Sequence, residues 1–210
     1  MDGSARQVVR RALAELDRPV VEDTGLQPAG VLALLYGRGD ESVVLLSKRS
    51  ESLARHPGEI SFPGGRCESG DRSLMHTALR EASEEVGVSP EDVEVLGELG
   101  RFTTVTDYEI SCYVGAIDHP YEFRVNRAEV ERLVEVPLGA LLDRRSVRDD
   151  VRVVDGDLVV LPSFAYDGSL IFGATARILD RMLDVLSTGG AGQGIMPVGS
   201  DSATPRPAHE

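Results

Sequence analysis

The pattern of apolar and polar positions along this chain predicts helices and strands in alternation. Apolar residues recur at helical spacing in residues 4–16, 73–86 and 175–186, and these three segments are predicted to be helices. Ser4 is the residue expected to cap the first helix. Gly87 follows the second helix, where a left-handed residue commonly ends the helical run.

Shorter apolar runs bounded by turn residues predict β-strands. Residues 30–36 and 42–48 flank a turn rich in glycine, so they are expected to form a hairpin. A second hairpin is expected where residues 151–154 and 158–161 flank Asp155-Gly156-Asp157. Further strands are predicted at residues 60–62, 93–105 and 110–117.

Two short segments in the second half of the chain are expected to be helical. Residues 128–134 are predicted to form one or two turns, and residues 138–142 another. Helices and strands are thus mixed, and hairpins dominate the connections. This order favours an α+β fold, an α/β/α sandwich, over a doubly wound parallel sheet.

Composition limits what kind of protein this is. The chain has 210 residues and a formal net charge of -13, which disfavours binding to a nucleic-acid backbone. No apolar run approaches the roughly 18 residues of a membrane span, and no signal peptide is expected. The two cysteines, Cys67 and Cys112, are far apart and are expected to be free thiols in the cytoplasm.

The chain is expected to hold one domain with appended ends. We assign residues 1–26 to an N-terminal helix and linker and residues 27–186 to the domain. Residues 187–210 are rich in Gly, Ser, Pro and Ala and are predicted to be a disordered tail.

Three glutamates give the predicted helix at residues 73–86 a candidate chemistry. Glu81, Glu84 and Glu85 share one edge of that helix. At about 4 Å, two such charges repel by about 4 kcal/mol at an effective dielectric near 20. A hard divalent cation such as Mg²⁺ relieves this repulsion. The alternative is a solvated acidic helix face, where like charges at this spacing cost only a few tenths of a kcal/mol.

The residues around these glutamates resemble a known family. Residues 80–88 read REASEEVGV, which resembles the second half of the Nudix box. Two features differ from the usual box: Asp71 stands where Glu is usual, and the loop from Asp71 to Arg80 is one residue longer. The longer loop occurs in a subgroup that resembles coenzyme A pyrophosphatases. Other stretches similar to that subgroup are LLSKRS at residues 45–50, HPGEISFPGG at 56–65, Glu129-Val130 and IFGATA at 171–176.

The resemblance implies a fold and a set of metal ligands. The fold is the Nudix fold, a mixed β-sheet between helices, here with an additional N-terminal helix. The cofactor is Mg²⁺ or Mn²⁺, held by the Gly65 carbonyl, Glu81 and Glu85, with Glu84 assisting. Gly64 and Gly65 allow backbone conformations that turn a carbonyl toward a cation. Arg80 is expected to pair with Asp71 or Glu84.

Other candidate residues keep two interpretations. Arg49 either contacts the phosphates of the substrate or is a surface cation at a strand end. His56 either belongs to a loop associated with coenzyme A or caps a turn. Glu129 is either a surface residue or a carboxylate from later in the sequence that completes the metal shell or acts as a base. The candidates for binding the substrate, in addition to the metal ligands, are therefore Gly64, Arg49 and His56.

The implied activity is hydrolysis of a nucleoside diphosphate-linked substrate. Coenzyme A or its derivatives would give 3′,5′-ADP and 4′-phosphopantetheine, with Glu81, Glu84 and Glu129 as candidate bases and Arg80 in support. The alternatives are the same chemistry on ADP-ribose, a dinucleotide or a nucleoside triphosphate, and a module that binds a nucleotide without turnover. The expected partner is a small-molecule nucleotide. Many relatives pair as homodimers, although no residue here indicates that by itself.

Overall fold

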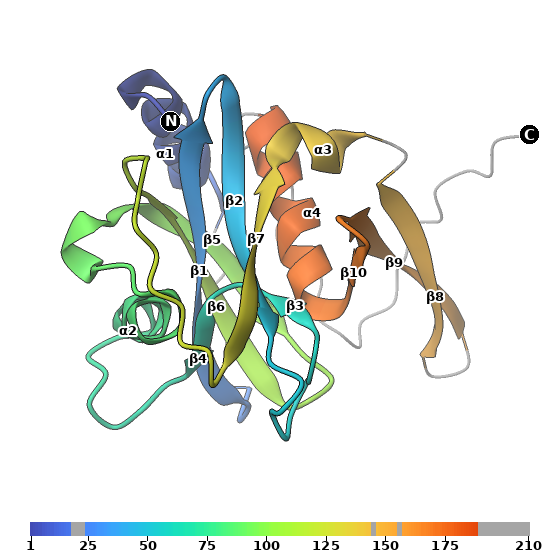
Figure 1. Ribbon diagram of the computed structural model, residues 1–210. Coiled ribbons are helices and arrows are strands. Elements are labelled where there is room, and N and C mark those ends of the chain that lie inside the picture. The colour runs from blue at the N-terminus through green and yellow to red at the C-terminus, as the bar shows by residue number, and fades with distance from the viewer. Residues whose placement is uncertain (18–23, 144–145, 155–156, 189–210) are drawn as a thin grey trace, which may run out of the picture.

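A seven-stranded mixed sheet forms the centre of the molecule (Figure 1). The computed structural model describes residues 1–17, 24–143, 146–154 and 157–188. The strands run in the order β3-β2-β1-β6-β5, while β4 also pairs with β1 and β7 with β2. β1 and β6 are parallel, and the other pairs are antiparallel. The strands are β1 Gln27–Arg38, β2 Glu41–Arg49, β3 Ile60–Ser61, β4 Gly64–Arg66, β5 Glu94–Thr103, β6 Tyr108–Ala116 and β7 Val130–Pro137.

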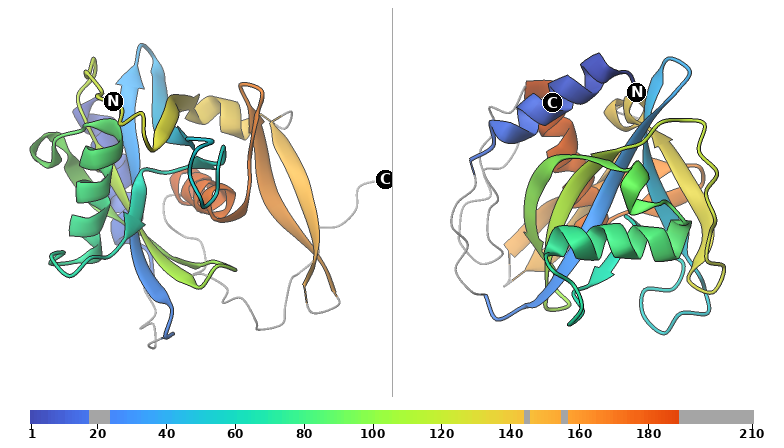
Figure 2. Two further views of the ribbon diagram at one scale, coloured as in Figure 1. Left: turned by 60° about the horizontal axis from the view of Figure 1, so that its bottom comes forward. Right: turned by 90° about the vertical axis from the view of Figure 1, so that its left-hand side faces the viewer.

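Helices cover both faces of this sheet. Helix α2 (Leu74–Val86) lies on one face, with the short 3-10 helix η1 (Pro90–Asp92) following it. Helices α1 (Gly3–Ala14) and α4 (Gly173–Thr188) pack on the other face, as the views in Figures 1 and 2 show. Helix α3 (Leu138–Leu142) follows β7. The predicted α+β class, with a mixed sheet between helices, is confirmed.

A smaller sheet lies beyond α4. It consists of β8 (Val147–Val154), β9 (Asp157–Tyr166) and β10 (Ser169–Ile171), and β9 packs against α4. The predicted second hairpin is confirmed, because β8 and β9 pair in antiparallel register. Both strands are longer than predicted. The turn residues 155–156 lie outside the described part of the chain.

The ends of α2 follow from its sequence. The Ser73 side chain accepts a hydrogen bond from the His76 N–H, which satisfies a donor of the first turn. Gly87 ends the helix in the left-handed region at φ 71°. Ala78, Ala82 and Val86 form its buried face, so small residues bring the helix close to the sheet.

Three expectations about segment boundaries need correction. The cap of α1 is Asp2, whose side chain accepts from the Ala5 N–H, and Ser4 lies inside the helix. Residues 128–134 are not helical, because β7 occupies most of that segment and pairs with β2. Finally, α4 continues through Thr188, beyond the expected start of the tail at Ser187. The rest of the expected tail, residues 189–210, lies outside the described residues.

The strand β7 shows why the helical prediction failed. Val130, Val134 and Val136 are buried, and the first and second of these are also spaced as on a helix. The pattern therefore fits both periods over so short a segment. Pairing with β2 decides the outcome, because it satisfies the backbone along one side of the strand. In the part of the chain described, no helix is long and apolar enough to cross a membrane.

Candidate active site

Two glycines let α2 lie directly on the sheet. Gly30 of β1 and Gly65 of β4 are cross-strand partners. A Cβ on Gly30 would lie 2.2 Å from the Leu74 carbonyl oxygen at the start of α2. A Cβ on Gly65 would lie 2.5 Å from the carboxylate carbon of Glu81. Since real Cβ contacts are not this short, a side chain on Gly30 would push α2 away from the sheet, and one on Gly65 would displace the Glu81 carboxylate.

Glu85 is the buried carboxylate of the site. Only 3% of the residue is exposed. The Gly64 N–H donates to its Oε2 (N···O 3.4 Å), and Arg49 Nη1 lies 3.9 Å from its Oε1. Burial raises the pKa of Glu85 to about 8, and the partial compensation by Arg49 does not reverse this. Among the described residues, the ion pair of Glu85 is therefore a long one, with Arg49.

Arg80 joins the other two glutamates of the helix. Its Nη2 lies 3.0 Å from Glu81 Oε1, and its Nη1 lies 3.0 Å from Glu84 Oε2. The Glu81 side chain is largely buried, and burial raises its pKa in spite of Arg80. The Glu84 side chain is more than half exposed. Each of the three glutamates thus meets a different balance of burial and charge.

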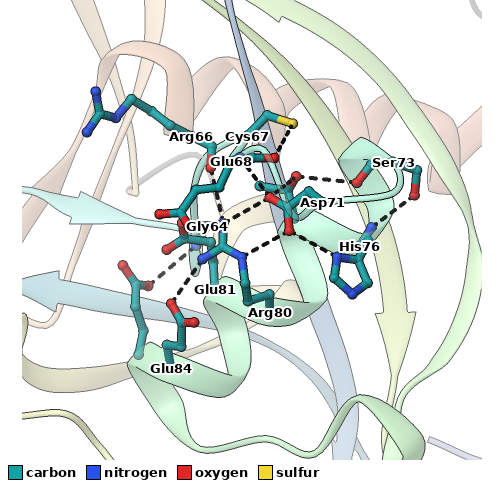
Figure 3. Close-up of polar contacts among 12 residues, drawn as sticks. Gly64, Arg66, Cys67, Glu68, Asp71, Ser73, His76, Arg80, Glu81 and Glu84 are labelled. Carbon is teal, nitrogen blue, oxygen red and sulfur yellow. Dashed lines mark hydrogen bonds and ion pairs between the residues drawn. The ribbon is translucent and has the colours of Figure 1, made fainter.

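Asp71 fixes the guanidinium of Arg80 from the other side, as Figure 3 shows. Arg80 Nε donates to Asp71 Oδ1 (3.0 Å) and Nη2 to Oδ2 (3.1 Å). The Asp71 side chain is 1% exposed, and the hydrogen bonds from Arg80 hold its pKa well below the ordinary value. Arg80 therefore contacts both predicted partners, Asp71 and Glu84, and Glu81 as well.

Asp71 has three further donors that sequence reasoning missed. The Glu68 N–H and the Thr77 hydroxyl each donate to its Oδ2 at 2.9 Å. His76 Nδ1 lies 2.9 Å from its Oδ1 (Figure 3). The loop that is one residue longer than usual is thus fastened to the helix through one carboxylate. The one available signal was the presence of His76 and Thr77 in the first turn of the predicted helix.

Glu129 approaches the glutamates of α2 from the start of β7. Its charge adds to the electrostatic repulsion that raises the pKa values of Glu81 and Glu85. The Asn126 side-chain amide donates to Glu129 Oε1 (3.2 Å). The Ser50 N–H donates to the Glu129 carbonyl (2.8 Å), which ties this residue to the chain that follows Arg49. The structure therefore brings a fourth carboxylate and Arg49 to the same place.

The other two candidates lie differently. Gly64 adopts φ 156° and approaches the Gly30 carbonyl so closely that a Cβ would lie 2.5 Å from it. His56 lies on the exposed loop between β2 and β3, where its Nδ1 is 3.0 Å from Glu59 Oε2. Its contact is therefore with Glu59 rather than with the carboxylates of α2. This geometry agrees with the interpretation of a histidine that caps a turn.

The donor set fits a divalent cation. The candidate ligands are oxygens alone, which hard cations such as Mg²⁺ prefer. The space above Gly65 that a Cβ would fill is instead lined by the Glu81 carboxylate. As the side chains stand, no three His, Cys, Asp or Glu residues in the described ranges enclose a metal position. Arg80 contacts Glu81 and Glu84, so a bound cation would have to exchange with that guanidinium.

Comparison with known proteins identifies the family. The model described as the NUDIX domain matches residues 26–155, well over half of the chain. The chain belongs to the Nudix family. Among its curated relatives is an uncharacterized Nudix hydrolase NudL from Pectobacterium atrosepticum, 38% identical over 66% of this chain and 72% of the relative. A NudL from an Enterobacter species is 39% identical over 73% and 80% of the two chains.

Solved structures of Nudix proteins share the fold. A MutT/nudix family protein from Enterococcus faecalis aligns with a TM-score of 0.55, covering 90% of this chain and 75% of its own at 15% identity. The Nudix hydrolase RenU from M. smegmatis aligns with a TM-score of 0.53, covering 77% and 86% at 18% identity. The family match and the NudL relatives show that this chain is a Nudix hydrolase. Enzymes of this family generally use divalent metal ions.

Proposed function

We propose that this Nudix hydrolase cleaves the diphosphate of coenzyme A or its derivatives, giving 3′,5′-ADP and 4′-phosphopantetheine. The observation that carries the reaction type is Glu85, a buried carboxylate beside Glu81 whose ion-pair partner among the described residues, Arg49, is 3.9 Å away. Such an arrangement favours a tightly bound cation. The substrate follows from the two stretches similar to coenzyme A pyrophosphatases, residues 45–50 and 56–65.

The fold supports a shared role for those two stretches. They flank the loop between β2 and β3, and the Arg49 N–H donates to the Glu59 carbonyl across its base (2.9 Å). The second stretch ends in Gly64-Gly65, directly beneath Glu81. A substrate held by this loop would therefore present its diphosphate to the carboxylates of α2.

Glu81, Glu84, Glu85 and the Gly65 carbonyl are the groups that would hold Mg²⁺ or Mn²⁺. When bound, these ions neutralise the diphosphate and make water a better nucleophile. Arg49 lies beside them, and its Nε is buried without a hydrogen-bond partner among the described residues. We assign this guanidinium to a non-bridging phosphate oxygen, because such donors act most strongly in a site that excludes water.

Glu129 is our candidate for the base that accepts the proton of the attacking water. Glu81 and Glu84 both contact the Arg80 guanidinium at 3.0 Å. The side-chain neighbour of Glu129 is the neutral amide of Asn126. The oxygens of Glu129 are therefore open to a water molecule, whereas Arg80 occupies an oxygen of both Glu81 and Glu84. Arg80 acts in support by positioning Glu81 and Glu84.

Product analysis tests the proposal. The pure protein is incubated with coenzyme A and Mg²⁺ or Mn²⁺, and the products are separated and identified. We expect 3′,5′-ADP and 4′-phosphopantetheine in equal amounts. Cleavage of ADP-ribose, a dinucleotide or a nucleoside triphosphate without cleavage of coenzyme A would reassign the substrate. Binding without turnover at any metal concentration would instead indicate a nucleotide-binding module.

The remaining expectations concern where the enzyme acts and with what. Cys67 and Cys112 are free thiols, which supports the cytoplasm as its location. A small-molecule nucleotide is the proposed partner, and pairing as a homodimer stays a prediction.

A further inference from the structure

Arg177 is a partly buried arginine that the proposed mechanism does not use. It lies in the early part of α4, on the face of the sheet opposite α2. Its Nη1 donates to the Thr103 carbonyl at the end of β5 (2.9 Å). A neutral carbonyl satisfies one of the five N–H donors of a guanidinium and leaves its charge uncompensated.

Other arginines of the protein show how unusual this is. Arg6, Arg80 and Arg101 each lie within 3.3 Å of a carboxylate oxygen. Arg55 and Arg66, for which the described part of the chain gives no ion pair, are exposed to solvent. Arg177 combines burial with the lack of an acidic partner among the described residues, and burial lowers its pKa. A partly buried charge with no acidic partner in the described ranges is a candidate for binding an anion.

Within the described ranges, Arg177 forms no ion pair. Glu109, the cross-strand partner of Thr103, is engaged by Arg101 (3.3 Å). Phe102, the neighbour of Thr103 in β5, is buried in the hydrophobic cluster on the α4 side. The guanidinium is therefore held between an apolar cluster and the end of a strand.

Helix α4 also contacts β3, the strand that precedes Gly64 and Gly65. The Thr175 hydroxyl donates to the Ile60 carbonyl of β3 (3.1 Å). Ile60 lies four residues before Gly64 in the chain. The start of α4 thus contacts two strands: β3 through Thr175 and the end of β5 through Arg177. β6 pairs both with the start of β1, beside Gly65, and with the end of β5, so Gly65 and Thr103 lie at the same end of the sheet.

We propose that Arg177 binds a phosphate monoester of the substrate, at an anion site separate from the metal-bound diphosphate. This inference rests on the proposed function, because coenzyme A carries a 3′-phosphate on its ribose in addition to the diphosphate. A planar guanidinium matches phosphate with paired hydrogen bonds, which a lysine cannot reproduce. Arg177 then selects substrates that bear this second phosphate.

A pair of substrates that differ by one phosphate tests this assignment. We compare kcat/KM for coenzyme A and dephospho-coenzyme A in the wild type, Arg177→Gln and Arg177→Lys. Arg177→Gln should lower the value for coenzyme A by about 10- to 100-fold and leave dephospho-coenzyme A nearly unchanged. The kcat/KM of Arg177→Lys for coenzyme A should fall between those of the wild type and Arg177→Gln, since lysine keeps the charge but lacks the planar guanidinium. Arg11→Gln removes the same charge from the exposed face of α1 and should change neither substrate.

Equal losses for both substrates would overturn the proposal, because they would indicate a structural role for Arg177. Unchanged values for both would also overturn it. If the wild type cleaves neither substrate, the proposed function fails, and binding decides the question independently. Calorimetric titration with 3′,5′-ADP and 5′-AMP should then show a preference for 3′,5′-ADP that Arg177→Gln removes. Equal affinities in the wild type would refute the anion site.

Discussion

At the scale of single residues, Glu85 shows a conflict between stability and function. Its carboxylate is buried beside Glu81, and the only nearby cation, Arg49, lies 3.9 Å away among the residues described. Burial raises its pKa to about 8 from the ordinary 4.5. In the absence of metal ions, folding therefore opposes the ionisation that metal binding requires.

The stability of the metal-free protein should consequently fall with pH. Because the folded-state pKa of Glu85 is raised, its contribution is fully present below about pH 4.5 and is lost as pH rises through about 8. Glu85→Gln stays neutral and should be more stable than the wild type at pH 9 by about 1 kcal/mol or more. Urea unfolding with a chelator at pH 5, 7 and 9 measures this difference. Glu84→Gln, at an exposed side chain, is the control, and a difference independent of pH would contradict the prediction.

The same substitution should remove activity. Glu85→Gln deletes one charge of the proposed metal site with little change of shape, so we expect kcat to fall by at least about 100-fold. The far-UV circular dichroism spectrum should match that of the wild type. A variant with wild-type turnover at saturating Mg²⁺ would refute the assignment of Glu85 as a ligand.

At the scale of elements, local sequence determined what could be predicted. The helix α2 was predictable because its capping serine, apolar face and terminal glycine all agree. The segment at residues 128–134 was not, because its apolar positions fit two periods and pairing with β2 decided between them. The motif placed Glu81, Glu85 and Gly65 in one site. The roles of Gly30 and Arg177 depend on distant contacts, which no local pattern contains.

The close approach of α2 to β1 makes Gly30 a sensitive position. Gly30→Ala would place a Cβ 2.2 Å from the Leu74 carbonyl oxygen, so the helix has to move. We expect a loss of about 1–3 kcal/mol in the free energy of unfolding, together with reduced activity. Chemical denaturation and steady-state assays measure the two effects.

Gly70 offers a matched control. A Cβ at this position would meet nothing within 4 Å, so Gly70→Ala should leave stability within about 0.5 kcal/mol of the wild type. If Gly30→Ala behaved like this control, the helix and strand would have to lie further apart than the structure places them.

At the scale of the whole molecule, the two faces of the sheet hold different parts of the proposed chemistry. The carboxylates lie on α2, whereas Arg177 lies on α4 across the sheet. Two separate hydrophobic clusters hold the two helices without any ligand: Ala78 and Ala82 belong to one, Ile178 and Leu179 to the other. The fold therefore does not need a metal ion to bring its layers together.

Removal of metal ions should leave the fold intact. With a chelator at pH 7, we expect an unchanged circular dichroism spectrum and a melting temperature lowered by no more than about 2–4 °C. Activity should disappear and return on addition of Mg²⁺ or Mn²⁺. Loss of the circular dichroism signal on chelation would show instead that the cation is part of the folding core, as in small zinc domains.

The contacts of Arg80 have a consequence for how the enzyme acquires its ion. The guanidinium already offsets part of the negative charge of Glu81 and Glu84, so these two carboxylates have a cationic neighbour in the chain without metal ions. A cation held by Glu81 and Glu84 would replace these two contacts, and the hydrogen bonds from Arg80 to Asp71 would keep the guanidinium nearby. Metal binding would therefore shift the guanidinium of Arg80 away from the two glutamates while leaving its contacts with Asp71 in place.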